Sequence, residues 1–271
     1  MALITISHNL GSRGPDIAQL TATALDMPLY DDRRMQAIAL ASGIHPDDLG
    51  GLDEKAPGFF DRVLSRRPDV YLDYMESVVY EMARRGSGVI VGHGSQMLLR
   101  DFDCALHVRV HAHETRRAER IAAAQGMDVA DARKLIAKAD ARQQGFFNFA
   151  FQKRWDDEAL YDLVVNTGKL VDAAAAAVIV AAASDQHVSE CSLTALESME
   201  RLALVKRIEA ELLKHEIDLK FLTIDIREEA RADISGLVFM PETVAAIPEI
   251  VRRVPGVRKV HSRVALMPPG V

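Results

Sequence analysis

Apolar and polar positions follow one another along the chain in blocks that predict strands alternating with helices. Five short apolar runs have the composition of buried parallel strands; they are Ala2–Ser7, Pro28–Tyr30, Gly88–Gly92, Ala105–Val110 and Asp162–Asn166. Segments between them repeat apolar residues every three or four positions and predict helices: Pro15–Leu25, Arg33–Ala41, Asp69–Arg85, Glu114–Gln125 and Val129–Gln144. This order predicts right-handed βαβ crossovers and an α/β fold with a doubly wound parallel sheet.

The pattern changes after Ala183. The polar stretch Ser184–Glu190 has no clear periodicity and is typical of a linker. The residues beyond it predict a helix, two strands, a helix and a strand, which are Leu196–His215, Lys220–Ile226, Ala232–Phe239, Thr243–Val254 and Val260–Leu266. We therefore expect two domains, 1–183 and 198–268, the second a small α+β (αββαβ) domain. The second has no glycine-rich loop and no His/Cys cluster, so we expect catalysis in the first.

Composition narrows the function classes. The 271 residues suffice for a full α/β domain and a smaller one. A net charge of −6 argues against a nucleic-acid polymer as the partner. Two cysteines, Cys104 and Cys191, lie far apart in the sequence and support neither a disulfide framework nor a zinc site. The first residues do not resemble a signal peptide, and the apolar segment 171–184 is too short to span a bilayer. We expect a cytoplasmic location.

A loop bracketed by glycines follows the first strand. Gly11 and Gly14 enclose it, and Pro15 and Asp16 suit the first turn of the next helix. Such a turn directs backbone N–H groups at an anion. Nucleotide loops commonly end Gly-Lys-Ser/Thr, but this corner reads Arg13-Gly14-Pro15 and lacks that lysine and hydroxyl. An ordinary β–α connection is the alternative; the loop's place at the carboxyl edge of the sheet favours a nucleotide site.

Arginines gather on the helix after the fourth strand. Arg116, Arg117 and Arg120 are spaced so that like charges share helix faces, which favours a nearby anion. The alternative is a solvated face neutralised by Glu114 and Glu119.

The next helix carries Lys138, Asp140 and Arg142 and leads into an aromatic stretch with Phe146, Phe147 and Trp155. Long helices that end in arginine and aromatic residues are typical of a lid that closes over a nucleotide. An aromatic-capped helical hairpin packed on the core fits the same residues.

The second and third strands also end in polar residues at the carboxyl edge. Asp31 and Asp32, after Tyr30, could hold Mg²⁺ or orient an acceptor hydroxyl, or they could begin the following helix. For Asp32 the helix cap is favoured. His8 and His93 lie in turns at this edge, where contact with phosphate is the alternative to a structural role.

The order of these motifs resembles the cytidylate kinase-like family, a P-loop branch of the nucleoside-monophosphate kinases. The resemblance covers about residues 1–183 and rests on Ile6–Ala18, Pro28–Asp31, Val89–Gly94, Arg117 with Arg120, and Trp155 with Tyr161–Thr167. His8, His93 and Gln143 stand where the family carries arginine. Imidazole binds phosphate less firmly than guanidinium does, so these departures weaken the expected phosphate binding.

The resemblance implies transfer of the γ-phosphoryl group of ATP, with Mg²⁺, to a nucleoside monophosphate, with CMP as a candidate acceptor. It implies catalytic roles for Arg13, Arg117, Arg120 and Arg142. It implies nucleotide binding by His8, Gly11, Ser12, Arg13 and Gly14. It places Tyr30, Asp31 and His93 on the acceptor side, with no residue assigned to a metal. The rival interpretation is a catalytically weak nucleotide sensor that signals through the C-terminal unit.

The C-terminal unit resembles a BON domain over about residues 198–268. The phrases Ile234–Val238 and Val254–Val260 carry this resemblance. It implies a regulatory or localising module with a lipid or protein partner. The sequence leaves open whether the chain forms a homo-oligomer.

Overall fold

The computed structural model describes residues 3–44, 68–185, 188 and 190–268. The chain divides into two compact units, one of Met1–Arg34 with Arg85–Leu193, the other of Met35–Arg84 with Thr194–Val271. The division after Leu193 lies close to the predicted linker Ser184–Glu190, which is itself partly outside the described residues. Met35–Arg84 groups with the C-terminal part of the chain, whereas the predicted domains, 1–183 and 198–268, follow sequence order. That domain division stays a prediction.

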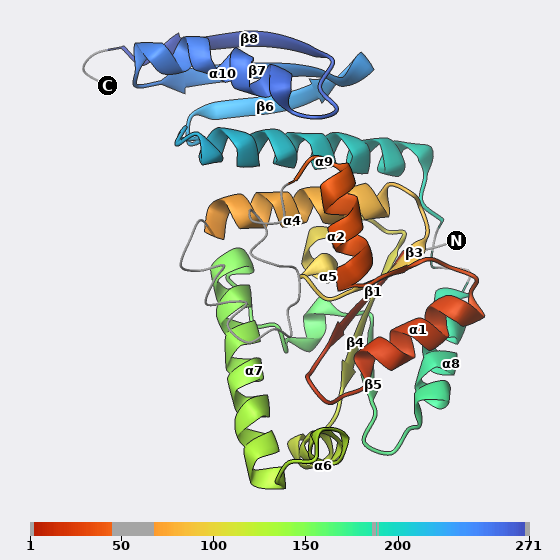
Figure 1. Ribbon diagram of the computed structural model, residues 1–271. Coiled ribbons are helices and arrows are strands. Elements are labelled where there is room, and N and C mark those ends of the chain that lie inside the picture. Colours follow the sequence, from red (N-terminus) through yellow and green to blue (C-terminus); the bar gives the residue numbers. More distant parts are fainter. Residues whose placement is uncertain (1–2, 45–67, 186–187, 189, 269–271) are drawn as a thin grey trace. The chain divides into compact units, whose positions relative to one another are not determined.

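The first unit is built on a five-stranded parallel sheet in the order β2-β3-β1-β4-β5 (Figure 1). Its strands are β1 (Leu3–His8), β2 (Leu29–Tyr30), β3 (Gly88–Val91), β4 (Ala105–His111) and β5 (Leu163–Asn166). Each predicted strand is confirmed to within a residue at each end, with Ala2 outside the described residues. The chain places β2 and β3 on one side of β1 and β4 and β5 on the other. The loop after β1 therefore opens where the strand order reverses, which is where such sheets bind ligands.

Helices α1 (Gly14–Ala24) and α8 (Asp172–Ala183) pack on the same face of this sheet, as Figure 1 shows. Small and β-branched side chains make that contact; they are Ile17, Ala18 and Ala22 of α1 and Ala175, Ala176 and Ile179 of α8. Helices α6 (Glu114–Gln125) and α7 (Val129–Phe151) form a hairpin around a smaller apolar cluster of their own. The short α5 (Ser95–Leu98) follows β3 and was not predicted.

Helix α7 continues from its predicted end at Gln144 to Phe151. Phe146, Phe147 and Phe151 pack edge to face with one another, and the first two are buried. Burial of these rings carries the helix past Gly145, a residue of low helix propensity. This arrangement supports the aromatic-capped hairpin; movement of α7 as a lid stays a prediction.

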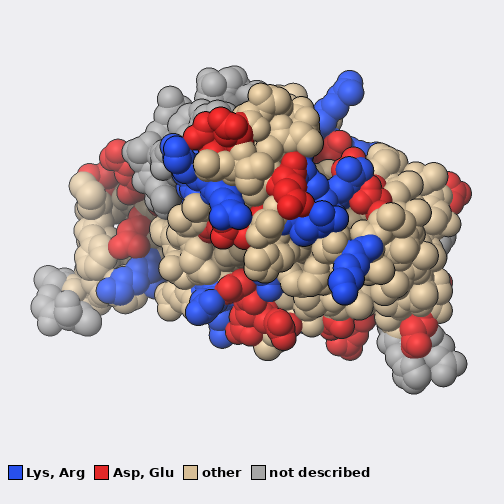
Figure 2. Space-filling view, turned by 90° about the horizontal axis from the view of Figure 1, so that it is seen from below, with Lys and Arg blue, Asp and Glu red and all other residues tan. Residues whose placement is uncertain are grey.

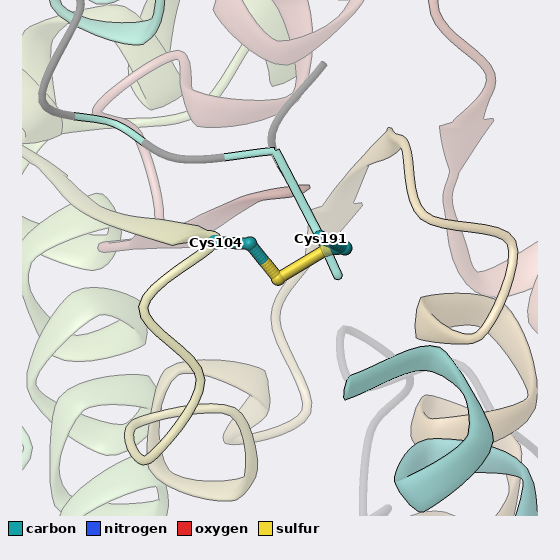
Figure 3. The surroundings of a disulfide bond; sticks show 2 residues. All are labelled: Cys104 and Cys191. Atoms are coloured by element: carbon teal, nitrogen blue, oxygen red, sulfur yellow. A yellow bond between two sulfur atoms is a disulfide. The ribbon is translucent and has the colours of Figure 1, made fainter. Parts of the chain in front are cut away.

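Cys104 and Cys191 form a disulfide within the first unit (Figure 3). The expectation that these cysteines form no disulfide is therefore wrong. Their separation of 87 residues in the sequence concealed their proximity in space. Because α8 returns the chain from the carboxyl edge of the sheet to its amino edge, the segment after α8 reaches Cys104, just before β4.

Reduction of this disulfide is expected to lower the free energy of unfolding by about 2–4 kcal/mol, because it releases a long closed loop in the unfolded chain. Guanidinium unfolding with and without dithiothreitol measures the effect. The variant Cys104→Ala/Cys191→Ala is the control, and its unfolding midpoint is expected to be the same with and without dithiothreitol. A parent midpoint that dithiothreitol does not move would contradict the prediction. Disulfides are rare in the cytosol, so the thiol state of the pair in cells also tests the predicted cytoplasmic location.

The second unit contains most of α2 (Asp32–Ala41), with α4 (Pro68–Ala83), α9 (Leu193–Lys214) and α10 (Pro241–Arg253). Its sheet has the order β6-β7-β8, with β6 (Leu222–Arg227) antiparallel to β7 (Arg231–Val238) and β8 (Lys259–Leu266) parallel to β7. The predicted order of helix, two strands, helix and strand is confirmed. None of the helices in the described ranges is both long and apolar enough to cross a bilayer.

Helix α9 joins α4 to the small sheet. Its apolar residues Leu204, Ile208 and Leu212 pack into the core of the sheet and α10. On α4, the Ser77 hydroxyl donates to the Ala203 carbonyl at 2.8 Å and the Tyr74 hydroxyl donates to Glu211 at 2.6 Å. This shared helix explains why the α4 segment belongs with the C-terminal part of the chain.

A cluster of charges between α4 and α9 makes stability depend on pH. Lys206 Nζ lies 3.1 Å from Asp73 and 2.9 Å from both Glu76 and Glu209. Burial raises the pKa of Asp73 to about 7, against the opposing effect of Lys206. The folded state then binds more protons than the unfolded state between about pH 4 and 7, so the free energy of unfolding falls as pH rises.

Asp73→Asn removes the carboxyl group that titrates in this range. The variant is expected to gain stability relative to the parent on going from about pH 5 to about pH 8. Urea unfolding at both pH values measures the gain. A stability difference that stays constant between the two pH values would contradict it.

Candidate nucleotide-binding site

The loop between β1 and α1 is shaped by two left-handed residues. Gly11 has φ 81° and Arg13 has φ 69°, and α1 begins directly after Arg13, with Pro15 in its first turn. No side chain caps α1, so the N–H groups of its first turn keep their capacity to bind an anion. The loop predicted from the glycine spacing is thus a tight turn into a helix N-terminus.

Both glycines are required by close contacts. A Cβ atom on Gly14 would lie 2.3 Å from the Cβ atom of His8, and one on Gly11 would lie 3.0 Å from the Arg117 carbonyl oxygen. The His8 ring therefore lies against the start of α1, with Nδ1 3.2 Å from the Asn9 carbonyl oxygen. The loop folds back on its own first residues.

Ser12 helps to hold this shape. Its side chain is buried, and its hydroxyl lies 2.7 Å from the Asn9 carbonyl oxygen and 3.0 Å from that of Val110. Its backbone N–H donates to the Asn9 carbonyl at 3.1 Å. The structure gives Ser12 a structural role, and its contact with a nucleotide stays a prediction.

Arg117 braces the loop from α6. Its Nε donates to the Leu10 carbonyl at 2.7 Å, and its two terminal nitrogens donate to the two carboxylate oxygens of Asp140 at 2.8 and 2.7 Å. The side chain is only 5% exposed. Asp140, on α7, thereby ties the α6–α7 hairpin to the loop.

Arg120 makes a second brace. It donates to the Gly11 carbonyl at 3.3 Å and to the Thr167 carbonyl at 2.6 Å. The Thr167 hydroxyl, which is buried, lies 3.0 Å from the Ser12 carbonyl oxygen. Burial and then the nearby charges of Arg116 and Arg13 lower the pKa of Arg120. Arg117 and Arg120 were predicted as catalytic; in this state both hold loop carbonyls.

An open pocket of about 320 Å³ lies beside the loop. Arg13, Arg116 and Arg120 line it together with the turn after β5, Gly168–Asp172. Nη2 of Arg13 is 2.5 Å from Asp172, the one carboxylate among these residues. On the face shown in Figure 2, Lys and Arg side chains alternate with Asp and Glu. The pocket itself has more cations than carboxylates and suits a small anionic ligand.

The two carboxylates that follow β2, those of Asp31 and Asp32, have different roles from the predicted ones. Helix α2 begins at Asp32, one residue earlier than predicted, so Asp31 occupies the cap position. The Asp31 carboxylate accepts from the Arg34 backbone N–H at 2.9 Å. Asp32 was favoured as the cap, which is wrong: its Oδ1 lies 2.9 Å from His93 Nε2. Asp31, predicted to face the acceptor, is the capping residue.

Tyr30 is a core residue. Its side chain is fully buried, and a Cβ atom on Gly88 would lie 2.4 Å from its ring. Arg34 stacks over the ring, 5.3 Å from its centre, and burial raises the pKa of the phenol. The predicted contact of Tyr30 with an acceptor has no geometric support here.

The hydrogen bonds around the half-buried Tyr161 side chain were not predicted from the sequence. The Tyr161 hydroxyl donates to the Trp155 carbonyl at 2.6 Å, lies 3.3 Å from the Ser7 hydroxyl and accepts from the Gln96 amide at 3.2 Å. Trp155 and Tyr161 belong to a motif that the sequence analysis noted, but no spacing in the sequence links them to Ser7 and Gln96, which come from distant segments. Arg142, also predicted as catalytic, is half-buried on α7 two residues after Asp140, so the two leave different sides of the helix.

Comparison with known proteins agrees with this fold. The family model described as the cytidylate kinase-like family matches residues 3–169. No curated protein matches the chain. The chain is similar to an uncharacterized protein from Eubacterium ventriosum ATCC 27560, with 19% identity and a TM-score of 0.52 over 69% of this chain and 100% of that one.

Two kinases of solved structure are more distantly similar. One is shikimate kinase from Acinetobacter baumannii in complex with shikimate, with 10% identity and a TM-score of 0.41 over 66% of this chain and 90% of that one. The other is a gluconokinase from Sinorhizobium meliloti 1021, with 14% identity and a TM-score of 0.37 over 73% of this chain and 93% of that one.

The BON resemblance of the C-terminal unit stays a prediction. Because the family model covers more than half of the sequence, the chain belongs to the cytidylate kinase-like family.

Proposed function

We propose that this protein transfers the γ-phosphoryl group of ATP to a small-molecule acceptor. The observation that carries the proposal is the Gly11–Gly14 loop, an uncapped helix N-terminus beside a pocket lined by Arg13, Arg116 and Arg120. Membership of a kinase-like family implies ATP as the co-substrate. Phosphoryl transfer depends mostly on positioning and on electrostatic stabilisation, which are what this loop supplies.

Each part of the loop has a task in this proposal. The first N–H groups of α1 bind the phosphates, and Arg117 and Arg120 hold the Leu10 and Gly11 carbonyls turned away from them. Arg13 is half-exposed and exchanges its bond to Asp172 for one to a phosphate. The anionic polyphosphate of ATP extends from the first turn of α1 into the pocket lined by Arg13, Arg116 and Arg120.

The side chains of the Gly11–Gly14 loop and the start of α1 do not offer ligands for a metal ion. Pro15 stands where a nucleotide loop commonly has a hydroxyl, and the Ser12 hydroxyl is directed at backbone carbonyls. The described ranges contain no group of three or more His, Cys, Asp or Glu residues that could hold a metal. We therefore expect Mg²⁺ to arrive with the triphosphate, bound by phosphate oxygens and water.

The test combines binding and turnover. Titration calorimetry with ATP measures binding, and a coupled assay for ADP release measures transfer to a panel of acceptors headed by CMP, as the family description suggests. Micromolar ATP binding with acceptor-dependent ADP release supports the proposal. A chain that binds no ATP would contradict it.

A catalytically weak nucleotide sensor is the second candidate. The observation in its favour is that Arg117 and Arg120, the cations expected to stabilise the transition state, are engaged with Asp140, Thr167 and the loop. Such a sensor would signal through the C-terminal unit, whose predicted lipid or protein partner remains a proposal. ATP binding without ADP release for any acceptor or for water would favour it.

A further inference from the structure

One ion pair joins the N-termini of α1 and α8, which pack side by side on one face of the sheet (Figure 1). Arg13 directly precedes the first turn of α1, and Asp172 is the first residue of α8. The Arg13 Nη2 atom lies 2.5 Å from the Asp172 carboxylate, and both residues line the pocket beside the loop. The pair therefore lies at the wall of the pocket, next to the N–H groups that are proposed to bind phosphate.

The backbone of Arg13 has the left-handed conformation, with φ 69° and ψ 22°. A residue with a Cβ atom seldom adopts this conformation, which persists where surrounding contacts hold it. The Arg13 side chain pairs with Asp172, which is 20% exposed, and lies 3.5 Å from Asp16, which is 62% exposed. Because water screens the exposed carboxylate more strongly, Asp172 is the main partner of Arg13.

Cations crowd around this pair. The lining of the pocket contains four cations, Arg13, Arg116, Arg120 and Lys169, and one carboxylate, that of Asp172. Burial, and then the charges of Arg116 and Arg13, lower the pKa of Arg120. The nearby Asp172 carboxylate acts in the opposite direction. Asp172 therefore offsets part of the repulsion among the cations, and a polyphosphate in the pocket would offset the same repulsion.

Both members of the pair have a second source of stabilisation close by. Asp172 lies in the first turn of α8, where no side chain caps the helix, so the helix dipole favours its negative charge. Arg13 adjoins the first N–H groups of α1, so its guanidinium can contact a phosphate that those groups bind. Arg13 can therefore turn from Asp172 to a phosphate without leaving either charge unstabilised.

We propose that Asp172 competes with the phosphate groups of the ligand for Arg13 and thereby sets the affinity of the site for polyphosphate. This inference rests on the phosphate site of the proposed function. A polyphosphate that extends from the first turn of α1 into the pocket takes Arg13, and Asp172 stays with the N-terminus of α8. Breaking the ion pair lowers the affinity below what the cations alone would give. Asp172 is a positioning residue, since it acts through Arg13.

Asp172→Asn tests the inference, because asparagine has nearly the same shape without the charge. We expect the variant to bind ATP and inorganic tripolyphosphate about tenfold more tightly than the parent does. About fivefold of this gain comes from the ion pair that no longer has to be broken. The remaining gain, about twofold, comes from the lost repulsion between the carboxylate and the ligand. Titration calorimetry at constant ionic strength measures both affinities.

The same substitution in an Arg13→Gly background separates these two effects. Glycine adopts the left-handed conformation freely, so the loop is expected to keep its shape. Only repulsion remains to be relieved there, and Asp172→Asn is expected to tighten binding by about twofold. If Asp172 acted by repulsion alone, its removal would give an equal or larger gain in this background than in the parent.

Asp131→Asn is the matched control. Asp131 lies in the first turn of α7 and pairs with Lys134 at 2.9 Å, but it does not line the pocket. Loss of this charge is expected to leave both affinities within about 1.5-fold of the parent values, because the carboxylate is exposed and screened.

A spectroscopic measurement covers the case in which Arg13→Gly binds too weakly for calorimetry. The ¹⁵N–¹H signal of Arg13 Nε is assigned by its loss in Arg13→Gly. Tripolyphosphate is expected to shift this signal in the parent, and Asp172→Asn is expected to shift it without any ligand. A signal that neither change moves would overturn the inference.

The outcomes separate this inference from the proposed function. Tighter binding in Asp172→Asn, with a gain that falls at least threefold without Arg13, supports the inference. A gain that does not fall, or an Asp172→Asn variant that binds no more tightly than the parent, overturns it and leaves the proposed function intact. The expected pattern with tripolyphosphate in a protein that binds no ATP supports the inference and overturns the proposed function. Absence of binding of both ligands to the parent and to Asp172→Asn overturns the two together.

Discussion

Replacing Gly14 by alanine is expected to weaken ATP binding by about 10- to 100-fold, the equivalent of the ~1–3 kcal/mol that an overpacked contact costs. The added Cβ atom would lie 2.3 Å from the Cβ atom of His8. Either the His8 side chain or the start of α1 must move, and both carry the geometry of the phosphate-binding loop. Titration calorimetry with ATP measures the loss, and circular dichroism checks that the fold is kept.

Gly145→Ala is the matched control. A Cβ atom there meets nothing within 4 Å. Because the position lies inside α7, alanine is expected to add about 0.5–1 kcal/mol of stability. Its ATP affinity is expected to equal that of the parent. Equal affinities for Gly14→Ala and the parent would place the nucleotide away from this loop.

Replacing Arg117 by alanine is expected to lower the free energy of unfolding by about 3 kcal/mol, because it deprives a partly buried carboxylate and a backbone carbonyl of charged donors. The lost bonds are the bidentate pair with Asp140 and the bond from Nε to the Leu10 carbonyl. We expect ATP binding to weaken as well, since the loop loses its brace. Guanidinium unfolding followed by circular dichroism measures the change in stability.

The double variant Arg117→Ala/Asp140→Ala is expected to recover part of this loss, since no carboxylate is left without its arginine. Arg133→Ala is the control for removal of an arginine, because its side chain is half-exposed and lies 3.9 Å from Glu114. It is expected to change stability by no more than about 0.5 kcal/mol. Equal effects of Arg117→Ala and Arg133→Ala would show that Arg117 does not brace the loop.

Local pattern was sufficient for the strands, for the loop and for most of the helices, although it predicted neither α5 nor α8. The run from Leu3 to His8 is buried on both faces of a parallel sheet, so its apolar composition predicts the strand. Pro15 and Asp16 mark the start of α1 because backbone φ and the helix dipole act over a few residues. The order of the motifs along the chain predicted the cytidylate kinase-like family. The model of that family matches the same part of the chain.

Helix ends and pairings were decided by tertiary structure. α7 passes Gly145 because the rings of Phe146, Phe147 and Phe151 are buried together. The α4 segment belongs with the C-terminal part because its Ser77 and Tyr74 bond to α9, more than a hundred residues away. Cys104 meets Cys191 because α8 returns the chain across the sheet. These contacts join residues that lie far apart in the sequence, so no local spacing pattern predicts them.

The sequence by itself determined that this protein has a parallel sheet with a glycine-bracketed loop at the carboxyl end of its first strand. Only the tertiary structure decided which contacts the polar residues at this edge of the sheet make. Asp31 caps α2 and Asp32 meets His93 because the helix begins one residue earlier than its pattern indicated. A shift of one residue turns a side chain by about 100° around a helix, since an α-helix has about 3.6 residues per turn. Strand and helix propensities average over many residues, whereas the direction of one carboxylate depends on a single backbone position and on a partner 61 residues away.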